Sequence, residues 1–119
     1  LGEAMGLLAA AKKLRTEADF YFKVSGRYFL NEDFRPDLWE GDVFVARMHG
    51  TAISTRLYGF GRKLFPDWQR ALKRSLRPLY KGRSIEEILP QMLGRELIRP
   101  IGLLGVSGFV APQGEYLTE

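Results

Sequence analysis

The pattern of apolar and polar residues divides the chain into alternating helical and extended segments. Apolar side chains recur at helical spacing in residues 1–15 and form one stripe in residues 66–80, so both segments are predicted to be helices. A third helix is expected to begin at Ser84, with Glu87 at the spacing of a capping box. Pro90 falls inside this helix and is expected to kink it.

Extended segments separate these helices. Residues 19–24 (DFYFKV) are rich in aromatic side chains, which is typical of a strand. Residues 42–48 alternate apolar and polar side chains, which predicts a half-buried strand, and residues 52–58 are its expected partner across a turn at His49 and Gly50. The apolar run 98–110 is interrupted by glycines and is expected to form one or two short strands.

The order of these elements predicts an α/β fold with a mixed sheet and flanking helices. Residues 20–24 are apolar on both faces, as in a central strand, yet few other strands remain to flank them. We therefore expect part of the sheet to be missing from this sequence. Residues 1–119 are expected to be a single domain, the carboxyl-terminal part of a longer one.

Composition narrows the classes of function. Hydrophobic residues make up 45% of the chain and charged residues 27%, which suits a packed core. With no cysteine and a single histidine, the sequence excludes disulfides, thiolate zinc sites and sites built from several histidines. No apolar run approaches the roughly 18 residues that a transmembrane helix needs.

The charge is concentrated in one segment. Residues 56–83 contain nine basic residues and one acidic residue, Asp67, so they carry +8 while the rest of the chain carries −4. Such a segment attracts phosphates, nucleic acid or an anionic membrane, although it can also be an ordinary solvated helix face. A small basic nucleic-acid-binding module is the alternative interpretation. Interleaved aromatic residues and known nucleic-acid motifs are absent, so nucleic acid is not the expected partner.

Four residues at the carboxyl end of the first predicted strand have the chemistry of an anion-binding site. They are Lys23, Ser25, Gly26 and Arg27. Ligands of open α/β sheets bind beyond the carboxyl ends of strands, and two fixed cations there suit a diphosphate. In the other interpretation, the two cations pair with Asp19 or Glu32.

Residues 1–30 resemble the middle of bacterial glycosyltransferases with the GT-A (nucleotide-diphosphosugar transferase) fold, and the motif Lys-Val-Ser-Gly-Arg-Tyr at 23–28 carries most of the likeness. The likeness weakens after Phe34 and reappears at residues 54–56 (STR) and 84–86 (SIE). It implies transfer of a sugar from a nucleotide diphosphosugar to a cell-surface polysaccharide or lipid-linked acceptor. It also implies a cytoplasmic enzyme of polysaccharide biosynthesis. The basic helix 66–80 is then expected to face the anionic inner membrane, because its apolar stripe and cationic face fit peripheral contact with a membrane surface. The nucleotide half would then precede these residues, so the 119 residues alone are expected to be inactive.

The resemblance also implies roles for individual residues. Inverting members of the family use a carboxylate at the start of a helix as the base, and Glu86 and Glu87 match it. Glu86 is preferred because Glu87 has the competing capping-box role, although both could simply favour the helix dipole. Arg56 matches an acceptor-side arginine region that contacts phosphate or an anionic sugar, but an ordinary surface arginine is the other interpretation.

The chain departs from the family at the metal site. Typical members hold a divalent metal with an Asp-x-Asp motif, whereas this chain has Lys23, Ser25 and Arg27 in that region. Cationic side chains can offset the charge of a leaving diphosphate directly. We therefore expect no obligatory metal. A divalent metal stays open as the alternative, with Asp19, Glu32 and Asp33 as the acidic residues nearest this strand.

Overall fold

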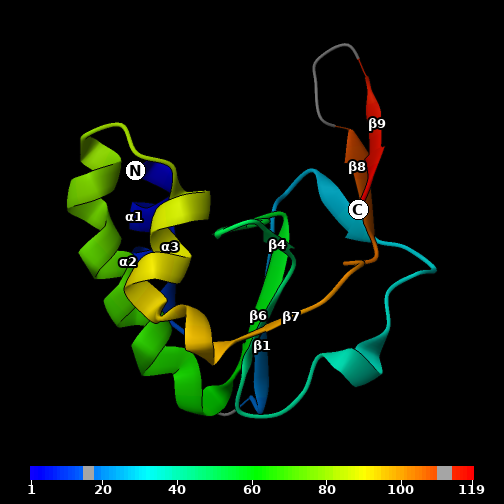
Figure 1. Cartoon of the computed structure of the whole chain (residues 1–119), viewed down its shortest axis with the longest axis horizontal. Helices are drawn as coiled ribbons and strands as arrows, with labels where there is room; N and C mark the ends of the chain where they lie inside the picture. The colour runs from blue at the N-terminus through cyan, green and yellow to red at the C-terminus, as the bar shows by residue number, and fades with distance from the viewer. Residues whose placement is uncertain (15–17, 110–113) are drawn as a thin grey trace.

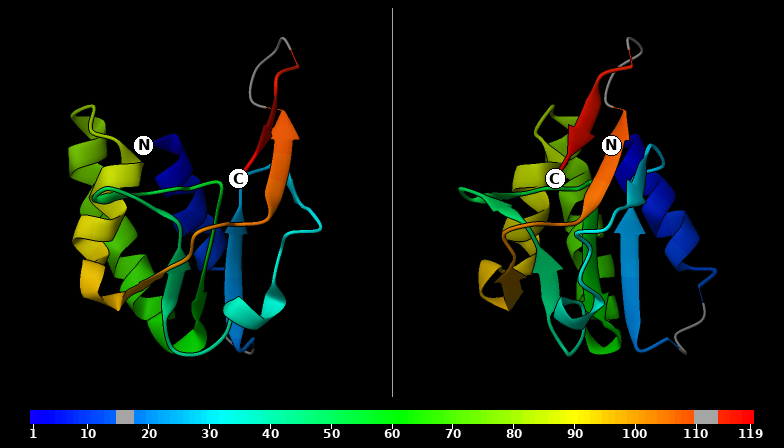
Figure 2. Two further views of the ribbon diagram at one scale, coloured as in Figure 1. Left: turned by 45° about the vertical axis from the view of Figure 1, so that its right-hand side comes forward. Right: turned by 90° about the vertical axis from the view of Figure 1, so that its right-hand side faces the viewer.

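The computed structural model describes residues 1–14, 18–109 and 114–119. Three helices pack on one face of a four-stranded mixed sheet, and a second, three-stranded sheet lies beyond the end of the first (Figure 1). Views from two further sides show the same layering (Figure 2). The expected α/β class, with a mixed sheet and helices, is confirmed.

The three predicted helices are all present. They are α1 (Gly2–Ala11), α2 (Phe65–Tyr80) and α3 (Ile85–Leu93), with single 3-10 turns at Pro36–Leu38, Arg62–Leu64 and Arg95–Leu97. The first helix ends at Ala11 rather than continuing to residue 15, which lies outside the described residues. Pro90 lies inside α3 as expected. No described helix has the length and apolar character needed to cross a lipid bilayer.

The strands form three separate sheets. The four-stranded sheet has the order β1 (Phe20–Val24), β6 (Leu57–Gly61), β3 (Phe44–Ala46), β7 (Ile98–Pro100), in which only β3 and β7 are parallel. The second sheet has the order β2 (Tyr28–Leu30), β8 (Val106–Phe109), β9 (Tyr116–Thr118), and the hairpin pairs β4 (Met48–His49) with β5 (Ala52–Ile53). The apolar run 98–110 thus supplies two strands, β7 and β8, to different sheets.

The strand predicted at 42–48 is more buried than expected. All three residues of β3 are fully buried rather than alternately exposed. Phe44 packs into the core beneath the helices, whereas Val45 packs into a second apolar cluster on the opposite face of the sheet. The predicted hairpin is confirmed as β4–β5, with Gly50 in its turn at a φ of +65°. In the four-stranded sheet β3 pairs antiparallel with β6, which begins at Leu57, four positions after the hairpin ends at Ile53.

The described sheet gives the strand at residues 20–24 one neighbour, and further strands that flank it from outside this sequence stay a prediction. Strand β1 lies at one end of the sheet and pairs with β6 alone. Its two faces are apolar because each is packed. Tyr21 stacks on Phe60 in the core beneath the helices, and Phe22 contacts Phe34 and Trp39 on the other side.

Burial of the tryptophans follows from the same two layers. Trp68 lies in the core beneath α2, as its position on the apolar stripe predicts, and its indole N–H donates to the Tyr58 hydroxyl at 3.0 Å. Trp39, in the loop before β3, is 4% exposed and packs with Phe34 on the opposite face of the sheet. It is therefore part of the core.

The outer edge of β1 is open among the described residues. Hydrogen bonds from Ser25 N to Arg56 O and from Arg62 N to Asp19 O fix the β1–β6 register. That register directs the backbone polar groups of Phe22 and Val24 outward. Phe22 and Val24 are 49% and 47% exposed. An open edge with apolar side chains is a template for pairing with another strand.

We expect this edge to make the 119-residue chain self-associate. The mean mass in sedimentation equilibrium should rise with concentration, and Val24→Lys should restore a monomer because a charged edge residue opposes pairing. Tyr80→Lys is the control, since Tyr80 is 79% exposed on α2 and away from the edge. Equal association of the two variants would show that another surface is responsible.

Candidate functional site

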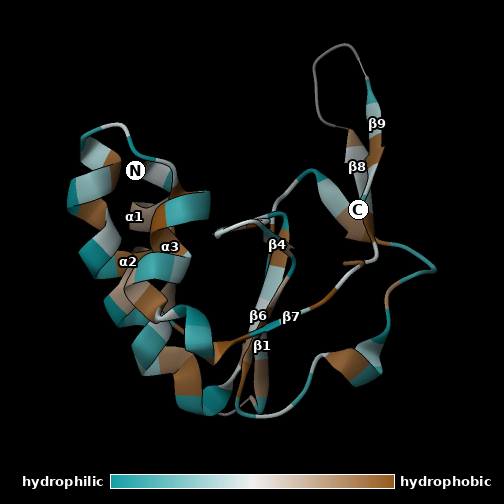
Figure 3. Cartoon of the chain, in the orientation of Figure 1, coloured by the Kyte–Doolittle hydropathy of each residue, from teal (hydrophilic) through white to brown (hydrophobic). Residues whose placement is uncertain are grey.

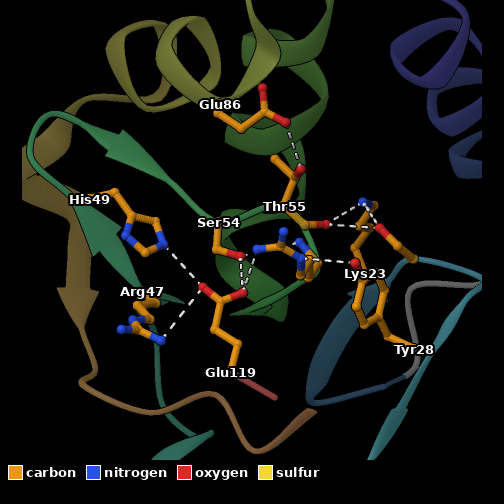
Figure 4. Close-up of polar contacts among 10 residues, drawn as sticks. Lys23, Tyr28, Arg47, His49, Ser54, Thr55, Glu86 and Glu119 are labelled. Carbon is orange, nitrogen blue, oxygen red and sulfur yellow. Dashed lines mark hydrogen bonds and ion pairs between the residues drawn. The ribbon is translucent and has the colours of Figure 1, made fainter. Parts of the chain in front are cut away.

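A polar pocket of about 350 Å³ lies where three elements meet. Its walls are the β4–β5 hairpin, the loop 54–56 that leads into β6, and the first turn of α3. The lining residues are His49, Ala52, Ile53, Ser54, Thr55, Arg56 and Glu86. Figure 4 shows the polar side chains around it.

The backbone holds the loop 54–56 from both sides. Ser54 N donates to Arg47 O at 2.9 Å, on the side of β3, and Arg56 O accepts from Ser25 N at 2.9 Å, on the side of β1. The loop is thus a bridge between two strands of the main sheet. Its side chains are presented from a fixed backbone, which is what a binding site requires.

A buried carboxylate, Glu119, lies beside this pocket and binds three of the residues that line it. Glu119 is 5% exposed; its Oε1 accepts from Ser54 Oγ at 3.0 Å and from Arg56 Nη1 at 2.8 Å. Its Oε2 lies 3.0 Å from His49 Nε2 and 3.7 Å from Arg47 Nη1. We call these five residues the Glu119 cluster. The carboxylate gathers side chains from residues 47–49 and 54–56 around one point (Figure 4).

The carboxyl group of Glu119 is ionised near neutral pH. Burial alone raises its pKa, but hydrogen bonds from Arg56, His49 and Ser54, together with the charge of Arg56, outweigh burial and lower the pKa below its ordinary value. Ser54 and His49 bind different oxygens of Glu119. They therefore do not form the serine–histidine pair that nucleophilic catalysis needs.

Arg56 is part of the pocket wall rather than an ordinary surface arginine. Its Nε donates to Tyr28 Oη at 3.0 Å, and its guanidinium carbon lies 5.5 Å from the centroid of the Tyr28 ring. With Nη1 bound to Glu119, the guanidinium is fixed on two sides. Its side chain remains 36% exposed, so it can still face a ligand.

Lys23 lies beneath the pocket and is held by several partners. It is 9% exposed; its Nζ pairs with Glu3 Oε1 at 2.5 Å and donates to Ser25 Oγ at 3.0 Å. It also donates to the carbonyl oxygen of Thr55. The pairing with Asp19 or Glu32 considered from sequence is therefore not seen. Instead Glu3, on α1, neutralises Lys23 and ties this helix to the end of β1.

The other motif residues lie in the turn between β1 and β2. Ser25 Oγ donates to Thr55 O at 3.1 Å, so Ser25 also supports the loop 54–56. Arg27 is exposed and forms no ion pair or side-chain hydrogen bond within the described parts of the chain. Nothing described lies within 4 Å of a Cβ built on Gly26. Of the two cations predicted to bind a diphosphate, only Arg27 is available in this structure.

Glu86 turns its carboxylate toward the pocket. Its Oε1 accepts from Thr55 Oγ1 at 3.1 Å, and its Oε2 accepts from the hydroxyl of Ser84. Partial burial raises its pKa, but hydrogen bonds from Ser84, its own backbone and Thr55, with the charge of Lys23, lower the pKa below its ordinary value. Glu86 is therefore ionised near neutral pH.

Glu87 faces away from the pocket. It is exposed, with its nearest charged partner Arg83 at 3.9 Å. The predicted capping box is wrong, because the Ser84 hydroxyl binds Glu86 instead of capping the backbone of α3. Ser84 is nevertheless the residue that precedes the helix, as expected. Of the two candidate bases, the structure brings only Glu86 into the pocket.

The described residues do not offer a fit for the divalent metal that the family resemblance implies. No three His, Asp or Glu side chains come together within the described ranges to hold an ion. At the end of β1 the chain presents Lys23, Ser25 and Arg27, whose side chains are cationic or neutral. No step is therefore assigned to a metal.

Several residues of the site could not be predicted from local sequence patterns. Glu119 reaches Arg56 across 63 positions of the chain, and Glu3 reaches Lys23 across the turn that follows α1. Tyr28 belongs to the motif at residues 23–28, but the motif does not predict its contact with Arg56. Long-range pairing of this kind is decided by the packing of the sheets rather than by local spacing.

Stability should depend on pH through Glu119. A carboxyl group whose pKa is lower in the folded chain than in the unfolded chain stabilises the fold fully above its unfolded pKa, about 4.3. That contribution is lost as the pH falls through the lower, folded value. Urea unfolding should therefore show a falling free energy of unfolding below about pH 5.

Glu119→Gln is the matching variant for this prediction. It should cost about 1–2 kcal/mol at pH 7 and flatten the acid branch of the profile, since glutamine does not titrate. Glu115→Gln is the control because Glu115 is exposed. Parallel pH profiles for wild type and Glu119→Gln would show that the cluster does not control acid stability.

Comparison of the chain with protein-family models, with curated protein sequences and with solved structures finds no match.

Proposed function

We propose that the chain is the carboxyl-terminal part of a glycosyltransferase catalytic domain of GT-A type. It would transfer a sugar from a nucleotide diphosphosugar to a hydroxyl of a polysaccharide or lipid-linked acceptor. The observation that carries this proposal is that segments far apart in the sequence contact one another in the fold. Three segments with the family likeness, residues 23–28, 54–56 and 84–86, meet at the loop 54–56, and this loop and Glu86 line the pocket. Lys23 Nζ contacts Thr55 O, and Thr55 Oγ1 contacts Glu86 Oε1 at 3.1 Å.

Glu86 is the proposed general base. An ionised carboxylate beside a polar pocket can accept the proton of an acceptor hydroxyl. As that oxygen forms a bond to the anomeric carbon of the donor sugar, the bond from this carbon to the diphosphate oxygen breaks. The proton passes to Glu86, and the electron pair leaves with the nucleoside diphosphate.

Arg27 and Lys23 take different roles in this proposal. Arg27, exposed beyond the end of β1, binds the diphosphate, whose oxygens match the two donors of a guanidinium. Lys23 is a positioning residue, because Glu3 already neutralises it and its remaining bonds go to Ser25 and Thr55. Its charge also helps to keep Glu86 ionised.

Release of nucleoside diphosphate tests the proposal. The protein that carries this chain is incubated with UDP-, GDP- and dTDP-sugars and glycan or lipid-phosphate acceptors, and one donor should be consumed only when acceptor is present. Arg27→Ala should raise the KM for that donor about tenfold, a modest effect because Arg27 is exposed. Arg35→Ala is the control, since Arg35 is equally exposed and pairs with Asp37. Consumption of none of these donors would contradict the proposed activity.

A further inference from the structure

The outer side of α2 carries a row of basic residues, which we call the basic stripe. It consists of Arg70, Lys73, Arg74 and Arg77 on α2 and of Lys81, the residue that follows the helix. At 3.6 residues per turn these five positions fall within about 100° of the helix circumference. All five are exposed. Bands of hydrophilic and hydrophobic residues alternate along this helix in Figure 3, as expected of an amphipathic helix.

The basic stripe contributes little to the fold itself. Trp68, Leu72 and Leu79 bury the opposite side of α2 in the core. Arg70 pairs with Asp67 at 3.3 Å, but the other four members have no ion pair or side-chain hydrogen bond among residues 1–14, 18–109 and 114–119. Like charges held side by side repel one another, so the stripe has an energetic cost in the isolated chain.

We propose that the basic stripe docks α2 onto an anionic phospholipid surface. The stripe is a single straight row on a helix whose axis is fixed by its buried side, which suits a flat array of negative headgroups. Tyr80 is 79% exposed and lies next to Lys81 at the end of the stripe. A tyrosine ring suits the boundary between headgroups and water, because one end is apolar and the other polar.

The observations favour a membrane over nucleic acid. Binding of single strands uses several aromatic rings interleaved with cations, whereas Tyr80 is the one aromatic side chain beside this stripe in the described part of α2. A membrane-facing helix also has a consequence for the site. Only four residues separate Lys81 from Glu86. Docking would hold the pocket close to the headgroups, within reach of a lipid-linked acceptor, and this last step rests on the proposed function.

Vesicle co-sedimentation tests the docking proposal without any sugar nucleotide. The protein should bind vesicles of two-thirds phosphatidylcholine and one-third phosphatidylglycerol at least about a hundredfold more tightly than pure phosphatidylcholine, and 0.5 M salt should abolish the difference. The variant Lys73→Gln/Arg74→Gln/Arg77→Gln should lose at least tenfold in affinity. Lys12→Gln/Lys13→Gln/Arg35→Gln removes the same charge at exposed positions off the stripe and should change the affinity less than twofold.

Three results would overturn the proposal. The first is equal loss of binding in the two triple variants, which would mean that net charge alone is responsible. The second is a wild-type protein that does not distinguish the two kinds of vesicle. The third is tighter binding to a 20-base-pair DNA duplex than to anionic vesicles at the same salt, with loss in the stripe variant only. Glu86→Gln should bind vesicles like wild type, so a failure of docking is distinguishable from a failure of the proposed activity.

Discussion

Replacing Glu86 by glutamine should lower the kcat of sugar transfer at least about a hundredfold, whereas Glu87→Gln should leave it within about twofold. A positioned general base contributes two to four orders of magnitude to rate. Glutamine has nearly the volume of glutamate, and its amide oxygen can still accept the hydrogen bond from the Thr55 hydroxyl. It cannot, however, act as a base and take the proton of the acceptor. Glu87 is the adjacent residue on the same helix and faces solvent, so it is a matched control.

The two variants should be compared by steady-state kinetics at saturating donor and acceptor. The KM for the donor should change little in Glu86→Gln, because the base acts on the acceptor proton. Thermal unfolding monitors whether the fold is kept. A silent Glu86→Gln combined with an inactive, folded Glu87→Gln would reverse the assignment and would show that the orientation of α3 differs in the active enzyme.

Replacing Gly105 by alanine should destabilise the fold by about 3–5 kcal/mol, combining backbone strain with overpacking. Gly105 has a φ of +81°, and a Cβ built there would lie 2.4 Å from the backbone nitrogen of Phe34. A backbone atom cannot rotate away as a side chain can. Gly105 also accepts from Asn31 N and donates to Glu119 O, both at 2.8 Å. The substitution should therefore displace Glu119 and loosen the pocket as well.

Gly114→Ala is the matched control for Gly105→Ala. Gly114 has a φ of +79°, nearly the same backbone conformation, but nothing described lies within 4 Å of its would-be Cβ. Only the strain of about 1–2 kcal/mol should remain there. Urea unfolding of both variants separates strain from close packing. Equal destabilisation by the two substitutions would contradict the close approach of Gly105 to Phe34.

Local signals predicted the helices well and the sheet only in part. The stripe of apolar residues in 66–80 and the serine at position 84 located α2 and α3, because both features are written in neighbouring residues. Apolar residues on both faces of β1 do not distinguish an edge strand from a central one, since an aromatic cluster packs on one face and the helices pack on the other. Strand order depends on contacts between distant segments, which spacing does not report.

The same limit applies to the candidate site. Lys23, Ser25, Arg56 and Glu86 were identified from sequence, and the structure gathers them around the loop 54–56. Their partners were not identified: the capping geometry gave no hint that Ser84 would bind Glu86. Lys23 differs from the prediction because its charge is already neutralised by Glu3 within the folded chain, and it is therefore not free to bind a diphosphate.

The most direct test of the proposed site is a titration of the protein with UDP-, GDP- and dTDP-sugars, followed through its backbone amide chemical shifts. We expect one donor to shift the amides of residues 25–27, 54–56 and 84–86 together, because the loop 54–56 contacts both other segments and residues 25–27 form the turn proposed to bind the diphosphate. Shifts confined to α2, or no shifts with any of these donors, would contradict the assignment of this pocket to glycosyl transfer.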